Sequence, residues 1–408
     1  MARNILIISI VWLAATAFVA ANPVRKILLA GGFEREYLIY TPLEHPQREK
    51  ADGIIVCLHG FGRSMNDFFD EYNLSNIADS LNLIIAAPQA LPEQDPQVLL
   101  DAATINSLTN NMIPLHSVWG CGLSVGISLF GINLFNDELN KDIDDVDFID
   151  RMIDQILSEY SLPAENLFIL GTSMGGYMTY QFALRKGERL SGIVSIAGSM
   201  GLAVKGMNYA IKLPICDFHS VTDEVVPYTG SMEQFLSVIS LAMPKTDVIN
   251  YWTKTNATGD PVVEPIQYYP STNGITVEKT TYPEEENEVI HYKINGAPHN
   301  YFFKKEAGDC MDYAEEIVRF VQSHFSKYHP QSLHIPLQTA FFYPNPVQDK
   351  IYFDTGNSIV SIYDIAGMQL FSQSFVDGKA DLSFLKSGIY FIRIQSENTI
   401  RTGKLIKR

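Results

Sequence analysis

The stretch LFILGTSMGGYMTYQFAL, residues 167–184, decides the fold. An apolar segment runs into a glycine-rich corner, and the residues after the corner predict a helix. The corner has the pattern Gly-x-Ser-x-Gly, with Ser173 between Gly171 and Gly175. A strand-to-helix turn tight enough to expose a serine brings neighbouring backbone very close, and glycine avoids the clash that a Cβ would cause. We therefore predict that Ser173 is a nucleophile at the end of a buried strand.

Apolar strand patterns alternate with amphipathic helix patterns on both sides of this corner. Strands are predicted at GIIVCLHGFG (53–62), LNLIIAAPQAL (81–91) and GIVSIAG (192–198). A helix is predicted at DDVDFIDRMIDQILSEY (144–160), where Asp144 is the expected N-cap. Buried strands alternating with such helices predict an α/β fold with a mostly parallel sheet and helices on both faces. With the Gly-x-Ser-x-Gly corner between strand and helix, this arrangement resembles that of the α/β-hydrolases.

Three segments depart from this pattern. Residues 1–21 carry one positive charge, an apolar stretch and small residues at the end, which predicts a signal peptide. A retained membrane anchor is the alternative, but the stretch is shorter than a span needs. Residues 91–140 are too long for an ordinary connection and are expected to form a lid-like insertion in a catalytic domain of residues 22–336. Residues 337–408 read as short alternating strands, which predicts a small all-β sandwich domain.

The net charge of −16 argues against nucleic-acid binding, because that binding depends on Lys and Arg at phosphates. Anionic lipid surfaces are disfavoured for the same reason. Residues 342–408 contain eight basic and six acidic residues, so the acidity belongs to the rest of the chain. After the N-terminal stretch, no segment is apolar for long enough to give a stable membrane span.

Four cysteines leave three possible pairings in an exported chain. Cys57 and Cys216 lie in apolar runs and fit the role of small buried hydrophobes. Cys121 and Cys310 are the better disulfide candidates. None of the four has the spacing of a zinc site, and we expect no metal or organic cofactor.

A serine hydroxyl needs a base to take its proton and an acid to orient that base. In α/β-hydrolases these partners follow the serine in the order acid, then histidine, on loops after later strands. LPICDFHSVTDEVVPY, residues 213–228, supplies Asp223 just past a strand. The adjacent Glu224 is the alternative, whereas Asp217 falls inside the apolar run.

The histidine comes from EVIHYKINGAPHNYFF, residues 288–303. His299 lies in a glycine-proline loop after a strand, which is the position that the order requires. His291 lies within the strand itself and is expected to be structural. The predicted catalytic residues are therefore Ser173, Asp223 and His299.

The oxyanion of an acyl-transfer reaction needs hydrogen-bond donors. The amide of Met174, directly after the nucleophile, is one candidate. The loop LHGFG should supply the second, from the amide of Phe61 or, as the alternative, of Gly62. His59 in the same loop is expected to fix the loop by hydrogen bonding.

Aromatic side chains could also shape a pocket for the acyl group. Besides Phe61, the candidates for this substrate pocket are Trp119, Tyr177 and Tyr228. Aromatic residues more often belong to the core, so each of them also has a purely structural interpretation.

Several segments, taken in order, resemble one known family. They are FEREYLIYTP, LHGFGRS, IIAAPQA, the tryptophan Trp119, DDVDFIDRMIDQI, NLFILGTSMGGYMTY and FHSVTDEVVPY. This series resembles the secreted polyhydroxybutyrate depolymerase and feruloyl/acetylxylan esterase family of α/β-hydrolases, over about residues 27–325. The resemblance implies a serine esterase with the three catalytic residues named above. The run GAPHNY around the histidine differs from the Gly-Gly-His-Thr type of many relatives. Residues 244–282 also lack the cysteines that many relatives have there, so the resemblance does not identify the substrate of this chain.

The tail from Tyr343 resembles a type IX secretion sorting domain. The resemblance lies in YPNP, IYDIAGMQL, SGIYFIRI and the basic end GKLIKR. It implies export by the type IX secretion machinery to the cell surface or the medium. The alternative is an ordinary β-sandwich accessory module, such as a sugar-binding one, although the tail has no cluster of aromatic residues typical of a sugar platform.

The sequence thus predicts a secreted serine esterase that cleaves carboxylic esters through an acyl-enzyme. The expected substrates are feruloyl or acetyl esters of polysaccharide, or a polyester. A serine peptidase of the same fold is one alternative, since the same residues cleave amides. A non-catalytic cell-surface binding protein on a hydrolase scaffold is the other.

Overall fold

The computed structural model falls into two compact units, residues 1–330 and residues 331–408, and each is described by itself. It describes residues 23–42, 51–109, 113–129, 132–201, 211–230, 237–238, 242–325, 342–343, 346–353, 358–364, 369–375, 378–395 and 400–408. The predicted signal peptide and the predicted domain boundary at residue 337 lie outside these described ranges.

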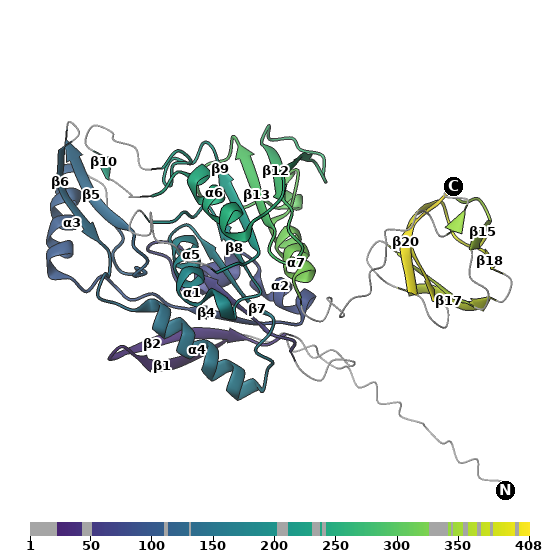
Figure 1. Ribbon diagram of the computed structural model, residues 1–408, viewed down its shortest axis with the longest axis horizontal. Coiled ribbons are helices and arrows are strands. Elements are labelled where there is room, and N and C mark those ends of the chain that lie inside the picture. Colours follow the sequence, from purple (N-terminus) through teal and green to yellow (C-terminus); the bar gives the residue numbers. More distant parts are fainter. Residues whose placement is uncertain are drawn as a thin grey trace, which may run out of the picture. The chain divides into compact units, whose positions relative to one another are not determined.

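A twisted ten-stranded sheet forms the centre of the larger unit (Figure 1). Its strands, in spatial order, are β1 (Val24–Ala30), β2 (Phe33–Tyr40), β4 (Ile84–Pro88), β3 (Ile54–Leu58), β7 (Leu167–Thr172), β8 (Gly192–Ile196), β9 (Ile215–Ser220), β13 (Val289–Asn295), β12 (Thr276–Tyr282) and β11 (Val262–Ile266). The six strands from β4 to β13 run parallel, and antiparallel strands flank them on both sides. The mostly parallel α/β-hydrolase sheet that the sequence predicts is therefore present.

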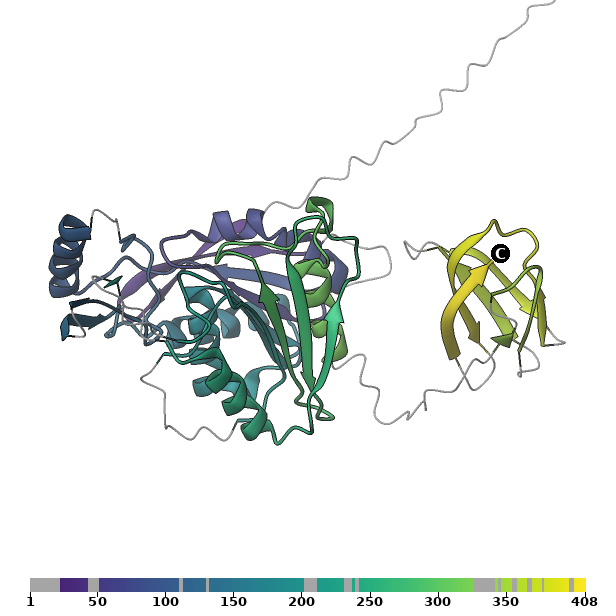
Figure 2. The same ribbon diagram turned by 90° about the horizontal axis from the view of Figure 1, so that it is seen from above.

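Apolar side chains on both faces of the central strands explain why the sheet is covered twice. Ile54, Val56 and Leu58 of β3 pack into one hydrophobic cluster, while Ile55 and Cys57 pack into the other. Successive side chains of a strand point to opposite faces, so a continuous apolar run needs helices on each side. Figure 2 shows helices on both sides of the sheet.

The helices divide between these two clusters. The first cluster receives α4 (Asp145–Tyr160), α5 (Met174–Lys186) and α6 (Lys245–Asn256). The second receives α1 (Met65–Glu71), α2 (Leu74–Leu81) and α7 (Tyr313–Ser323). Asp144 caps α4 as predicted, because its side chain accepts a hydrogen bond from the amide of Asp147. None of the described helices combines the length and the hydropathy of a membrane span.

The segment 91–140 forms structure of its own. It contains helix α3 (Pro96–Thr109) and the hairpin of β5 (Ser124–Leu129) and β6 (Ile132–Glu138). A short strand from further along the chain, β10 (Ser237–Val238), pairs with β5 and completes a three-stranded sheet. The insertion is therefore tied to the part of the chain that follows β9.

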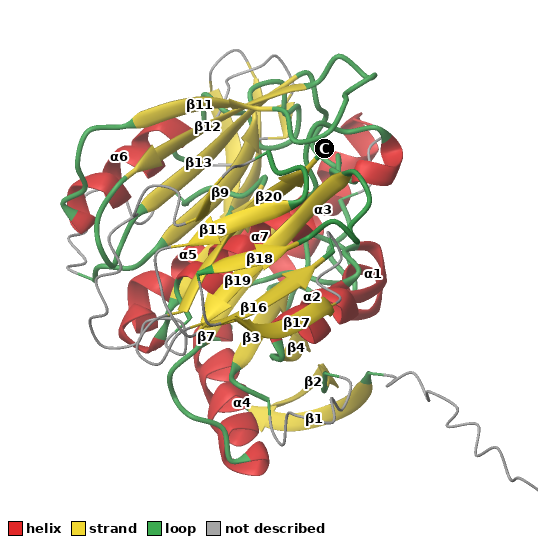
Figure 3. Cartoon of the chain, turned by 90° about the vertical axis from the view of Figure 1, so that its right-hand side faces the viewer, coloured by secondary structure: helices red, strands yellow, loops and turns green. Residues whose placement is uncertain are grey.

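The smaller unit has its own hydrophobic cluster, and its described elements are all strands, drawn yellow in Figure 3. One sheet consists of β14 (Phe342–Tyr343), β15 (Lys350–Phe353) and β18 (Lys379–Asp381). The other consists of β17 (Gln369–Phe375), β16 (Ser358–Tyr363), β19 (Gly388–Gln395) and β20 (Ile400–Lys407). Its paired strands are antiparallel, in agreement with the all-β expectation.

All four cysteines are free and buried, so the predicted pairing of Cys121 with Cys310 is wrong. Cys121 belongs to the first cluster and Cys310 to the second. These clusters lie on opposite faces of the sheet, and a disulfide needs Cα atoms within about 7 Å of each other. Cys57 and Cys216 are fully buried strand residues, as predicted.

Candidate active site

Ser173 stands at the carboxyl end of β7 and is the N-cap of α5. Its backbone has φ 53° and ψ −120°, a conformation that a residue with a Cβ rarely adopts. Its amide donates a hydrogen bond to Ile196 O at the end of β8 (2.8 Å), which anchors the turn to the neighbouring strand. The turn leaves the serine side chain partly exposed at the edge of the sheet.

The glycines on either side of the serine are required by close backbone contacts. A Cβ on Gly171 would lie 2.1 Å from Gly175 O. A Cβ on Gly175 would lie 2.1 Å from Leu58 O, in the neighbouring strand β3. Both contacts are shorter than any that a Cβ makes, so only glycine lets the strand and the helix meet around Ser173.

A hydrogen-bonded chain links Ser173, His299 and Asp223. The Oγ of Ser173 lies 2.9 Å from His299 Nε2, and His299 Nδ1 lies 2.7 Å from Asp223 Oδ2. The carboxylate can only accept, so Nδ1 carries the proton and Nε2 accepts from the serine hydroxyl. This tautomer leaves the imidazole able to take the serine proton. The three side chains follow β7, β9 and β13, whose carboxyl ends lie on one edge of the sheet.

Asp223 is held as an ionised acceptor. Its Oδ1 accepts hydrogen bonds from the amides of Val225 (2.9 Å) and Val226 (2.8 Å). Burial acts to raise the pKa of Asp223, but the hydrogen bond from His299 and the nearby histidines outweigh burial, so the pKa lies below its ordinary value. Glu224, the alternative acid, instead accepts from the main-chain amide of His299 (3.1 Å).

The loop after β3 lies directly against the serine. A Cβ on Gly60 would lie 3.3 Å from the Cβ of Ser173 and 3.8 Å from its Oγ. The amide of Gly62 donates to Ser117 O (2.9 Å), which commits it to the protein. Of the two amides that the sequence offers from this loop, Phe61 is therefore the remaining candidate for an oxyanion donor. Met174 begins α5, and the first amides of a helix have no partner within the helix.

His59 fixes this loop as a neutral imidazole. Its Nδ1 lies 2.8 Å from Gly60 O and must donate, while its Nε2 accepts from the amide of Ala90 (3.1 Å). Trp119 donates from Nε1 to His59 O (2.9 Å), and the two rings lie 4.9 Å apart. Burial is the main reason that the pKa of His59 falls to about 4.

This histidine should make stability depend on pH. An unfolded histidine has a pKa of about 6.5, so between pH 6.5 and 4 the unfolded chain binds a proton at His59 that the folded chain does not. The free energy of unfolding therefore falls on acidification, by about 1.4 kcal/mol per pH unit for one proton. Urea unfolding at several pH values from 6 to 4.5 gives the slope of the free energy of unfolding against pH. In the variant His59→Gln this slope should be smaller than in wild type by the contribution of about one proton. Equal slopes in variant and wild type would mean that His59 is not held neutral.

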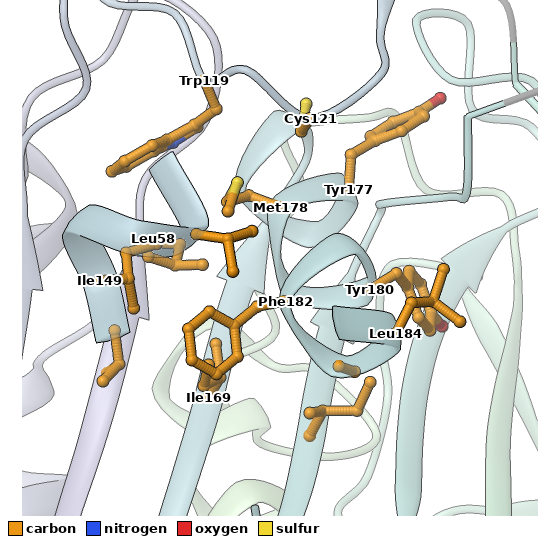
Figure 4. Packing of buried hydrophobic residues seen from close by; sticks show 14 of the residues in the cluster. Leu58, Trp119, Cys121, Ile149, Ile169, Tyr177, Met178, Tyr180, Phe182 and Leu184 are labelled. Atoms are coloured by element: carbon orange, nitrogen blue, oxygen red, sulfur yellow. The ribbon is translucent and has the colours of Figure 1, made fainter. Parts of the chain in front are cut away.

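Two of the predicted pocket residues belong to the core. Trp119 and Tyr177 have 0% and 1% of their surface exposed and pack in the first cluster (Figure 4). They contribute packing rather than an open acyl pocket, which corrects the prediction. Tyr228 is partly exposed, and its hydroxyl bonds His291 Nε2 at 2.9 Å.

His291 belongs to a buried polar network that sequence reasoning did not assemble. Asp217 accepts hydrogen bonds from Lys245 Nζ (2.6 Å), Tyr180 Oη (2.8 Å) and His291 Nδ1 (2.8 Å). Burial acts to raise the pKa of Asp217, but Lys245 and His291 outweigh burial and lower the pKa below its ordinary value, so the carboxylate stays ionised. Asp217 thus serves the interior, as its place in an apolar run indicates.

A cavity of about 340 Å³ adjoins the loop after β3. Its lining includes Gly62, Arg63, Gln89, Ser117 and His116. Within the described ranges, no three His, Cys, Asp or Glu side chains gather in a way that could hold a metal ion.

Two family models match the chain. Residues 130–249 match a phospholipase/carboxylesterase model, and residues 341–408 match a secretion system C-terminal sorting domain. The probable feruloyl esterase C of Aspergillus niger (strain ATCC MYA-4892 / CBS 513.88 / FGSC A1513) is 28% identical over 94 residues, which cover 23% of this chain and 34% of that relative. The chain thus matches about a third of the relative's length. The chain has an α/β-hydrolase fold, with one segment that matches carboxylesterases and a C-terminal segment that matches a sorting domain.

Solved structures give a more distant likeness. An acetyl xylan esterase from Aspergillus awamori is 12% identical, covers 73% of this chain and 99% of its own, and has a TM-score of 0.44. An acylaminoacyl peptidase in complex with Z-Gly-Gly-Phe-chloromethyl ketone is 14% identical, with coverages of 77% and 43% and a TM-score of 0.46. Identities this low say nothing about which substrate this chain takes.

Proposed function

We propose that this protein is an exported serine esterase that cleaves carboxylic esters through an acyl-enzyme. The observation that carries the proposal is the hydrogen-bonded chain from Asp223 through His299 to Ser173, on a strained turn between strand and helix. Such a chain makes the serine hydroxyl a nucleophile near neutral pH. The matched carboxylesterase segment favours esters as the substrate class.

The reaction follows from this geometry. Ser173 Oγ attacks the ester carbonyl as His299 Nε2 takes its proton, and Asp223 stabilises the imidazolium. The amides of Met174 and Phe61 donate to the oxyanion that forms. Its collapse expels the alcohol, which takes the proton from His299. Water, deprotonated by the same imidazole, then attacks the acyl group, and release of the acid restores Ser173.

The acyl group is proposed to be feruloyl or acetyl on a polysaccharide, or an acid unit of a polyester. The name of the Aspergillus niger relative supports the feruloyl member of this set. The matched sorting domain supports export by type IX secretion to the cell surface or the medium, where such polymers are met.

A substrate panel tests the proposal. The protein without residues 1–21 should hydrolyse p-nitrophenyl acetate and at least one of acetylated xylan, methyl ferulate and a short polyester. An aminoacyl p-nitroanilide serves as the control, and turnover on it should be far slower. A higher kcat/KM on the anilide would identify a peptidase, and no turnover of any of these by folded protein would favour a binding protein.

A further inference from the structure

The loop that carries His299 is held by the turn that carries Asp223. Strands β9 and β13 pair in parallel up to Ser220 and Ile294, and the amide of Val221 continues this pairing by donating to Ile294 O (2.9 Å). After this point the segments that follow β9 and β13 leave the sheet, and side-chain hydrogen bonds connect them. The distance between acid and imidazole is therefore set beyond the end of the sheet.

Two hydroxyl groups of the acid turn, residues 220–224, bond one carbonyl of the histidine loop, residues 297–299. Ser220 Oγ donates to Ala297 O at 2.6 Å, and Thr222 Oγ1 donates to the same oxygen at 2.9 Å. A carbonyl oxygen has two lone pairs, so the two hydroxyls use its full capacity. Ala297 is 2% exposed, so its carbonyl would be costly to leave unsatisfied.

A third contact holds the other side of the same loop. Glu224 Oε2 accepts the amide hydrogen of His299 at 3.1 Å. Between these contacts Pro298 has a fixed φ and no amide hydrogen, and its carbonyl accepts from the amide of Tyr301 (3.1 Å). Every main-chain polar group from Ala297 O to the His299 amide thus has a partner, and three of the four partners, Ser220, Thr222 and Glu224, come from the turn that carries Asp223.

We propose that Ser220, Thr222 and Glu224 are positioning residues that fix the main chain around His299 and thereby hold its imidazole at Ser173. The inference rests on the proposed esterase function. A misplacement of about 1 Å can slow an enzyme by about 10²-fold. Because acylation and deacylation both use His299, both steps should slow together, which lowers kcat and leaves KM nearly unchanged.

The variants Ser220→Ala and Thr222→Val test the shared carbonyl in full-length protein with p-nitrophenyl acetate. Each single variant keeps one donor on Ala297 O and should lose only a few-fold in kcat. The double variant loses both donors and should fall by about 10²-fold, with KM within about twofold of wild type. The double variant S220A/T222S keeps one hydroxyl and should recover most of this loss. Wild-type kcat in S220A/T222V, or an equal loss in S220A/T222S, would overturn the inference.

Glu224 gives a second test that does not touch the buried carbonyl. Glu224→Ala removes the acceptor for the His299 amide and should lower kcat by about tenfold at constant KM, whereas Glu224→Gln keeps an oxygen acceptor and should restore it. Glu224 is exposed, so its two variants should fold and can test the inference even if S220A/T222V does not fold. Unchanged kcat in Glu224→Ala would then contradict the inference. An inactive wild type would instead overturn the esterase function, and the positioning role with it.

Discussion

Ser173→Ala is expected to lower kcat for ester hydrolysis by about 10⁶-fold, the loss seen when a serine hydrolase loses its nucleophile. The imidazole of His299 bonds Asp223 through Nδ1 and the Ser173 hydroxyl through Nε2, and this hydroxyl is the group proposed to form the acyl-enzyme. Without the hydroxyl, the proposed oxyanion donors and the binding of substrate still favour direct attack by water, which leaves a small residual rate. Initial rates with p-nitrophenyl acetate, at enzyme concentrations high enough to detect that residue, measure the effect.

Thermal unfolding provides the control for this variant. The Ser173 side chain is partly exposed and the substitution removes one hydroxyl, so the midpoint of unfolding should stay within a few degrees of wild type. A variant that folds normally and keeps more than a tenth of the wild-type kcat would rule Ser173 out as nucleophile.

Gly175→Ala is expected to destabilise the protein by more than about 3 kcal/mol, or to prevent folding. The new methyl would lie 2.1 Å from Leu58 O and 2.7 Å from His59 O, and both atoms are backbone that the sheet holds in place. Relief would require α5 to move away from β3, and this would also displace Ser173 from the loop after β3. Urea unfolding gives the change in stability, and ester turnover should be lost even where some folded protein remains.

Gly259→Ala is the matched control for this substitution. A Cβ at Gly259 would come no nearer than 3.5 Å to its neighbour Pro283 O, which is an ordinary van der Waals contact. The free energy of unfolding should then change by less than about 0.5 kcal/mol. If Gly175→Ala were as mild as Gly259→Ala, the close meeting of α5 with β3 would be contradicted.

The sequence was most informative where a structural feature depends on residues close together in the chain. The strand, corner and helix around Ser173 lie within one short stretch, and their glycines have a single steric explanation. Asp223 and His299 could be proposed because the strand order of the fold places them after β9 and β13. Asp144 was predictable as a cap for the same local reason.

Predictions about side-chain environment were weaker. Helix α5 is buried on nearly every side from Met174 to Leu184, so its sequence has no polar face that would separate core from site. Tyr177 was therefore assigned to a pocket although it lies in the core. Strand β11 was not predicted, because four of its five residues are exposed and Pro265 interrupts the pattern, as proline does on edge strands.

The contacts of the acid turn could not be predicted from sequence. The partner of Ser220 and Thr222 is the carbonyl of Ala297, more than seventy residues away. A backbone carbonyl has no side-chain signature, so only the fold reveals that two hydroxyls share it. The same holds for the loop after β3, where the hydrogen bond from Gly62 to Ser117 O favours Phe61 as the proposed donor.

Mapping the site of a fluorophosphonate adduct tests the central claim most directly. Folded protein should gain one phosphonyl group, and peptide mass spectrometry should place it on Ser173, because its hydroxyl lies 2.9 Å from His299 Nε2, which can act as the base. An adduct on a different residue, or an unmodified Ser173 in protein that still turns over esters, would contradict the account.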